Sequence, residues 1–232
     1  MNKKARVPFL VVNPKNYLYG KESLELAKAA DQVAKDLDIQ VYFTCPYTDA
    51  RMISENTEYI TVTAQNMDSL VPGRGVGKVL GEALKEAGVG ALFLNHAENP
   101  KTVSELYKTV KRAKELEFIT IVCADSVTEA KALSLFDPDV VLAEPTDLIG
   151  TGQTADDDYI TNACKEIRAI NPNVQPMIAS GVSTADDCYH MVKLGADGTG
   201  ATSGILNAAD RPAEIRAWAE AILKAYKERT NG

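Results

Sequence analysis

The chain has 232 residues, 45% of them hydrophobic, which is enough to bury one large core without a second domain. The formal net charge of -7 and a pI near 5.0 argue against a nucleic-acid binder, since no dense run of Lys and Arg is present to neutralise phosphodiesters. The four cysteines lack CxxC spacing, no apolar stretch has the length of a membrane span, and the N-terminus lacks the pattern of a secretion signal. We therefore expect a cytoplasmic protein with no metal site, no disulfide framework and no membrane contact.

Short apolar runs rich in β-branched residues alternate with longer amphipathic stretches, as in repeated βα units around a parallel sheet. Helical patterns such as Ser23–Asp36 and Val103–Glu115 separate the predicted strands. These strands are, in chain order, Pro8–Val12, Gln40–Thr44, Tyr59–Thr63, Ala91–Asn95, Thr120–Cys123, Val140–Ala143, Gln175–Ala179 and Gly198–Ala201. The even unit length favours a closed (β/α)8 barrel rather than a long doubly wound sheet. We therefore expect a single α/β domain that spans residues 1–232.

Two helix starts carry readable capping residues. Asn99 and Pro100 are predicted as N-cap and first helical residue of the helix that contains Val103–Glu115. Ser183 is predicted to open the helix that follows the seventh strand.

Polar residues follow three of the predicted strands. Asn13 and Lys15 come after the first strand, Asn95 and His96 end or follow the fourth, and Glu144 follows the sixth. Each residue alone also fits an ordinary loop or surface position. In such a barrel, however, the carboxyl ends of the strands form the active site. A carboxylate base, a neutral acid and a fixed cation together are the groups that move a proton beside a carbonyl.

The loops after the seventh and eighth predicted strands are rich in glycine and small residues. Glycine lets backbone N–H groups approach an anion, and phosphate held by the last two loops recurs in barrels of this kind. Tight turns would explain either glycine joint alone. We expect the phosphate contacts at Ser180, Gly181, Gly200 and Ala201. The GTGATSG run lacks the spacing of a Rossmann or Walker loop.

Taken in order, the motifs of nearly the whole chain resemble the triosephosphate isomerase family, in particular its compact archaeal-type branch. The residues that carry this resemblance are Asn13-Pro14-Lys15-Asn16-Tyr17, Ala64-Gln65-Asn66, Asn95-His96-Ala97-Glu98-Asn99, Ala143-Glu144-Pro145, Leu148-Ile149-Gly150-Thr151-Gly152 and Gly195-Ala196-Asp197-Gly198. The resemblance implies a TIM barrel in which Lys15 stabilises the developing enediolate charge, His96 polarises the substrate carbonyl and Glu144 shuttles the proton. It also implies that Asn13 and Glu98 support this site.

The same resemblance implies two functional loops. Pro145–Thr151 would be a lid over the site, with Gly150 and Gly152 near its hinge and backbone around Gly150 reaching the phosphate. Asn66–Lys78 would be a protruding loop that contacts a second subunit, so we expect a homodimer or a homotetramer. A flexible surface loop is the ordinary alternative for Asn66–Lys78.

The chain departs from the family in two places. Ala97, Asn99 and Pro100 stand where the family usually has Ser, Arg and Arg around the shared glutamate, and Pro14 replaces the usual aromatic residue before the lysine. The proton-transfer groups remain in place. The orientation of Glu98 and the size of the substrate are left open.

The expected function is interconversion of D-glyceraldehyde 3-phosphate and dihydroxyacetone phosphate through an enediol, with a small phosphorylated sugar as substrate and with no metal or organic cofactor. One alternative is an isomerase of a slightly longer ketose phosphate, such as a tetrulose phosphate. Another is a barrel that binds a phosphorylated metabolite without catalysis, because a fold does not by itself fix a function.

Overall fold

Eight parallel strands close into a barrel in the computed structural model, which describes residues 5–145, 155–179 and 181–231. Each strand pairs with its neighbours in chain order, and β1 closes the ring by pairing with β8. The strands are β1 (Phe9–Val12), β2 (Gln40–Cys45), β3 (Thr61–Ala64), β4 (Ala91–Leu94), β5 (Ile119–Ala124), β6 (Val140–Ala143), β7 (Gln175–Ile178) and β8 (Gly198–Ala201). The predicted (β/α)8 barrel is confirmed.

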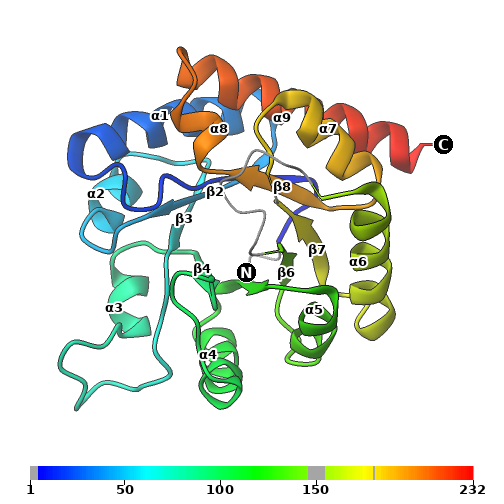
Figure 1. Cartoon of the computed structure of the whole chain (residues 1–232). Helices are drawn as coiled ribbons and strands as arrows, with labels where there is room; N and C mark the ends of the chain where they lie inside the picture. The colour runs from blue at the N-terminus through cyan, green and yellow to red at the C-terminus, as the bar shows by residue number, and fades with distance from the viewer. Residues whose placement is uncertain (1–4, 146–154, 180, 232) are drawn as a thin grey trace.

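The helices surround the barrel as an outer layer (Figure 1). They are α1 (Gly20–Leu37), α2 (Ala50–Glu55), α3 (Gly81–Glu86), α4 (Val103–Glu115), α5 (Val127–Ser134), α6 (Asp157–Ile170), α7 (Ala185–Lys193), α8 (Ser203–Leu206) and α9 (Arg211–Thr230). The last helix, α9, packs against both α7 and α1, so the end of the chain covers its beginning. Within the described residues, no helix combines the length and the apolar character needed to cross a membrane.

The strands are buried on both faces and separate two apolar clusters. Phe9 and Val11 belong to the cluster inside the barrel, whereas Leu10 and Val12 belong to the cluster between strands and helices. This alternation follows from the strand geometry, which points successive side chains to opposite faces. The outer cluster includes the fully buried Trp218 of α9.

Closure between β1 and β8 depends on glycine. In the register of this pair, Gly198 lies opposite Phe9 and Gly200 lies opposite Val11. A Cβ atom at position 198 would be 2.3 Å from the Phe9 ring, and one at position 200 would be 2.0 Å from the Val11 carbonyl oxygen. Any side chain at Gly200 therefore collides with backbone, which cannot move without opening the barrel.

Several predicted strand bounds were wrong by one or two residues. The third strand begins at Thr61 instead of Tyr59, because the backbone N–H groups of Tyr59 and Ile60 donate to Asp31 Oδ1 of α1, at 2.7 and 3.0 Å. These bonds hold the approach to the strand against the helix. At the other end of a strand, Asn95 falls outside β4 and has a left-handed φ of 61°, which turns the chain away from the sheet.

Both predicted helix starts were also wrong in position. Thr102 is the N-cap of α4, its hydroxyl accepting from Glu105 N at 3.2 Å, whereas Asn99 lies in a turn and donates from its backbone to His96 O at 2.7 Å. Thr184 is the N-cap of α7 in a capping box with Asp187. In both helices the N-cap is a threonine three residues before an acidic residue, and it follows the predicted N-cap, Asn99 or Ser183, in the chain.

The segment between β3 and α3 extends away from the barrel (Figure 1). Its ends are joined at Asp68, whose backbone N–H donates to Val79 O at 2.9 Å and whose Oδ2 accepts from Val79 N at 2.7 Å. Lys101, with a side chain only 7% exposed, lies 3.8 Å from Asp68 Oδ1. The loop is thus fixed at its base to the segment that precedes α4.

Candidate active site

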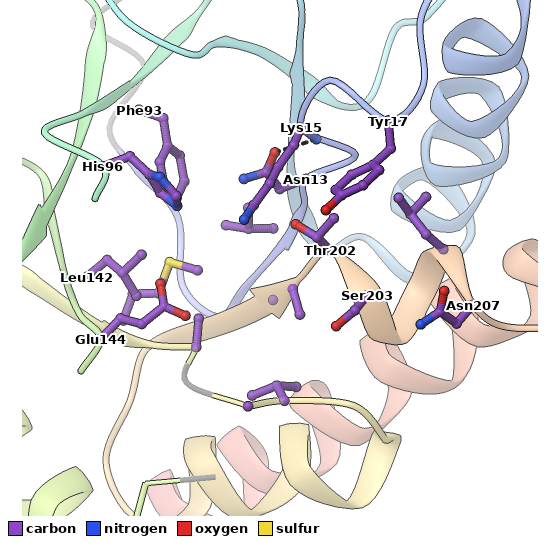
Figure 2. A pocket seen from close by; sticks show the side chains of 18 of the residues that line it. Asn13, Lys15, Tyr17, Phe93, His96, Leu142, Glu144, Thr202, Ser203 and Asn207 are labelled. Atoms are coloured by element: carbon purple, nitrogen blue, oxygen red, sulfur yellow. Dashed lines mark hydrogen bonds between the residues drawn. The ribbon is translucent and has the colours of Figure 1, made fainter. Parts of the chain in front are cut away.

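A cavity of about 480 Å³ opens at the carboxyl ends of the strands (Figure 2). Its floor is apolar and includes Phe93, Leu142 and Met177 of the inner cluster. Most of the residues predicted for the site line it, namely Asn13, Lys15, His96, Glu144, Gly181, Gly200 and Ala201. Gly150 and Ser180, like most of the predicted lid, lie outside the described residues.

Lys15 is held through its backbone. Its φ of 49° is left-handed, a conformation that is uncommon for residues other than glycine. The backbone N–H donates to Asn13 Oδ1 at 2.9 Å, and the carbonyl accepts from Gln65 Nε2 at 2.9 Å. Asn13 Oδ1 also accepts from the Thr44 hydroxyl of β2. These contacts fix the direction in which the lysine side chain leaves the chain.

The Lys15 ammonium meets the carboxylate of Glu98 across the rim, with Nζ and Oε1 2.6 Å apart. The hydrogen bond from Lys15 lowers the pKa of Glu98 below its usual value. Lys15 is 20% exposed at its side chain and Glu98 62%. Glu98 therefore points toward the lysine even though the residues on both sides of it depart from the family pattern.

His96 has a defined proton position. Its Nδ1 accepts from the backbone N–H of Glu98 at 3.2 Å, so the proton of a neutral ring lies on Nε2. Burial lowers the pKa of His96, and the nearby Lys15 charge lowers it further. The ring packs near Phe93, with centroids 6.3 Å apart. The site thus contains a neutral imidazole that can donate a hydrogen bond from Nε2.

Glu144 stands at the end of β6, where its backbone N–H donates to Ala124 O of β5 at 2.9 Å. Burial raises its pKa to about 7, against the lowering effect of Lys15, and the charges of Asp125 and Glu98 add to the rise. Figure 2 shows Glu144 and His96 on one side of the cavity, with Lys15 facing them. A carboxyl group with this pKa exchanges protons readily near neutral pH.

Asn95 precedes His96 in the chain, but its side chain bonds to the backbone of other segments instead of facing the cavity. Its Nδ2 donates to Cys123 O at 2.9 Å, and its Oδ1 accepts from Lys101 N at 2.9 Å. These bonds tie the end of β4 to β5 and to the segment before α4. Asn95 is not among the residues that line the cavity.

Sequence reasoning missed part of the lining. Tyr17, Thr202, Ser203, Asn207 and Arg211 also border the cavity, which they enlarge on the side of α8 and the start of α9. Ser203 and Asn207 have the i, i+4 spacing that places side chains on one helix face. That spacing, just after the glycine run, is the sequence signal that could have identified these two residues. The sequence gives no such signal for Arg211, because the turn between α8 and α9 is what brings Arg211 to the cavity.

No group of three or more His, Cys, Asp or Glu side chains that could hold a metal ion occurs in the described parts of the chain. The four cysteines are free and buried. The lining of the cavity offers acid–base groups and hydrogen-bond donors.

Comparison with known proteins gives a consistent result. The family model for triosephosphate isomerase matches residues 8–222. A triosephosphate isomerase of Sulfolobus acidocaldarius is 33% identical over 227 residues, which are 96% of this chain and 98% of the relative. Those of Methanothermus fervidus and Methanocaldococcus jannaschii are 33% and 32% identical, and the matches cover 88% and 89% of this chain and 94% and 96% of the relatives.

Proposed function

Because the chain belongs to the triosephosphate isomerase family, we propose that it interconverts D-glyceraldehyde 3-phosphate and dihydroxyacetone phosphate at this cavity. The observation that carries the proposal is the meeting of Glu144, His96 and Lys15 at one end of the cavity. Glu144 is a buried carboxyl group with a raised pKa, and His96 carries its proton on Nε2. Lys15 is a cation whose backbone is fixed by hydrogen bonds.

The proposed reaction needs only proton transfers and no redox partner. Glu144 removes a proton from the carbon next to the substrate carbonyl, and the electron pair of that C–H bond moves to form the enediolate. His96 donates a hydrogen bond from Nε2 to the carbonyl oxygen, and Lys15 stabilises the negative charge that develops there. Glu144 then returns the proton to the neighbouring carbon, while His96 Nε2 gives its proton to the former carbonyl oxygen and takes up the proton of the substrate hydroxyl, whose oxygen becomes the new carbonyl. Aldose becomes ketose, or the reverse, with no net gain or loss of atoms.

Glu98 and Asn13 are positioning residues in this proposal. Glu98 holds the Lys15 ammonium by an ion pair and orients His96 through its backbone N–H. Asn13 accepts from the backbone of Lys15. Placement of reacting groups to within a fraction of an ångström is a large part of catalytic power.

The phosphate group is proposed to bind on the opposite side, at Gly181, Gly200 and Ala201, with Ser180 and Gly150 completing the contacts. Gly181 has a left-handed φ of 67° and lines the cavity together with Gly200. Small residues with accessible backbone are suited to anion contact. We refer to Gly181, Gly200 and Ala201 as the phosphate side.

A coupled assay with both triose phosphates tests this function. The wild-type chain is expected to turn over both, and Glu144→Gln is expected to reduce kcat by about 10²- to 10⁴-fold, the range for loss of a general base. Asp125→Asn is the matched control, because it removes a carboxylate that influences Glu144 but does not line the cavity. No turnover by the wild type, or wild-type turnover by Glu144→Gln, would contradict the proposal.

A four-carbon ketose phosphate remains the second candidate substrate. The observation that favours it is the size of the cavity, since about 480 Å³ lies within the range of about 300–1,000 Å³ for small-molecule pockets and does not restrict the ligand to three carbons. Comparing kcat/KM for three-carbon and four-carbon substrates decides between them. A higher kcat/KM for the tetrulose phosphate would replace the triose assignment.

We further infer one domain over residues 1–232, a cytoplasmic location and self-association as a homodimer or homotetramer. The four buried free cysteines support a reducing compartment.

On the loop Asn66–Lys78, Val71 is 60% exposed and Val76 fully exposed, which supports a contact with a second copy. Light scattering of the wild type and of Val76→Asp tests this, and a monomeric wild type would overturn it.

A further inference from the structure

The cavity continues past the phosphate side to Arg211, the first residue of α9. The Arg211 guanidinium donates from Nε to Leu206 O at 3.1 Å, which draws it over the end of α8. Within the described residues, it forms no other hydrogen bond and no ion pair. A partly buried guanidinium thus keeps its two terminal nitrogens available at the edge of the cavity.

The surroundings of Arg211 contain few compensating charges. Asp210 beside it is the N-cap of α9, and its carboxylate accepts from Ala213 N at 3.0 Å. Glu22 and Glu25 line a shallow groove on the other side of Arg211, without an ion pair to it. The cavity itself has Glu144 as the only acidic side chain of its described lining. Anions that enter from the phosphate side therefore meet a cation that has no salt-bridge partner in the described chain.

Two polar side chains connect the phosphate side with Arg211. Ser203, the first residue of α8, and Asn207, its C-cap, are exposed and lie about one helical turn apart. Neither makes a side-chain hydrogen bond in the part of the chain that the structure describes. Figure 2 shows both on the side of the cavity away from His96 and Glu144. Four helical positions rise about 6 Å. The two side chains can therefore reach neighbouring phosphate groups that are joined through a bridging oxygen.

We propose that Arg211, with Ser203 and Asn207, forms a second anion subsite beside the phosphate side, which accepts ligands of the diphosphate class and makes them compete with the substrate. The proposal rests on the proposed function only for the position of the first phosphate. A charged hydrogen bond from a guanidinium fork to a phosphate oxygen is among the stronger polar contacts in proteins. The subsite therefore discriminates inorganic pyrophosphate from inorganic phosphate.

The test measures dissociation constants by calorimetry for inorganic phosphate, pyrophosphate and tripolyphosphate, in metal-free buffer. In the wild type, pyrophosphate or tripolyphosphate is expected to bind at least about tenfold tighter than phosphate, and Arg211→Gln is expected to lose this gain while its affinity for phosphate stays within about twofold. Lys21→Gln is the matched control, because Lys21 borders only the groove on the other side of Arg211. It should keep the gain.

A second variant keeps the test independent of the Arg211–Leu206 contact. Asn207→Asp places a carboxylate at the subsite and is expected to weaken pyrophosphate binding more than phosphate binding. Equal gains in Arg211→Gln and wild type, equal losses in Lys21→Gln, or no preference for the longer anions in the wild type would overturn the subsite. Turnover of triose phosphates is measured separately. An active enzyme without the anion preference refutes only the subsite, and an inactive one with an Arg211-dependent preference refutes only the isomerase assignment.

Discussion

The two sides of the cavity are built differently. One end holds Lys15, His96 and Glu144, and we call it the proton-transfer end after the role proposed for it. Its side chains are fixed by bonds from distant parts of the chain, such as Gln65 to the Lys15 carbonyl and Glu98 to the Lys15 ammonium. The phosphate side, in contrast, consists of two glycines and one alanine, Gly181, Gly200 and Ala201. The contrast teaches that proton transfer needs groups whose directions are set before the substrate arrives, whereas anion binding needs accessible backbone and small residues.

After the loss of Glu144 itself, the largest effect is expected from removing the cation Lys15. Lys15→Met should lower kcat by about 10²- to 10³-fold, comparable with the loss of one group that stabilises a developing oxyanion. Lys21→Met, which removes a lysine outside the cavity, is the control in the same assay. A decrease of less than about tenfold in Lys15→Met would mean that this side of the cavity is not organised around the lysine.

The phosphate side should respond through stability. Gly200→Ala is expected to lower the free energy of unfolding by about 1–3 kcal/mol or more, because the new Cβ would lie 2.0 Å from the Val11 carbonyl oxygen. Urea denaturation measures it. Ala201→Gly, which adds no atoms at the next position, should cost no more than about 1 kcal/mol. Equal stability of Gly200→Ala and the wild type would show that the β1–β8 contact is less tight than described.

Glu144 links the proton-transfer end to the stability of the fold. Its pKa is raised from the usual 4.5 to about 7 by burial, so the unfolded chain ionises it first. The contribution of this group to stability is therefore complete below pH 4.5 and is lost as the pH rises through about 7. Glu144→Gln should be more stable than the wild type by about 1–3 kcal/mol at pH 8 and similar to it near pH 4. Denaturation at both pH values measures the difference, and a pH-independent difference would contradict the raised pKa.

The smallest effect is expected at the exposed Glu98. Glu98→Gln should change the free energy of unfolding by less than about 1 kcal/mol, as is usual for exposed ion pairs. Because the Glu98 charge raises the pKa of both His96 and Glu144, the pH profile of kcat/KM should shift to lower pH in this variant. Glu98→Asp should restore part of the profile. An unchanged profile would leave Glu98 with no influence on the catalytic groups.

The barrel and the proton-transfer end could be predicted from the sequence because both depend on strand position. A residue just after an apolar run must lie at the rim, which places Lys15, His96 and Glu144 together. The helix starts were predicted wrongly, since the competing caps Thr102 and Thr184 differ from the chosen residues only in hydrogen bonds that form after folding.

The α8 side of the cavity was missed for a different physical reason. Ser203 and Asn207 look like ordinary exposed helix residues, and Arg211 reaches the cavity only because α8 is four residues long and the chain turns back after it. Such a turn depends on packing of α9 against α1 and α7, which no local pattern reveals. The predicted contacts at Gly150 and Ser180 lie outside the described residues and stay predictions.

The most direct test of the central claim, that Glu144 moves a proton between substrate and enzyme, is isomerisation in D₂O followed by NMR. The wild type should form product with solvent deuterium at the carbon that receives the proton, because a carboxylic acid exchanges with solvent. Glu144→Gln should incorporate deuterium at least about 10²-fold more slowly. Product free of solvent deuterium, or incorporation by Glu144→Gln at the wild-type rate, would contradict the role of Glu144 as the base.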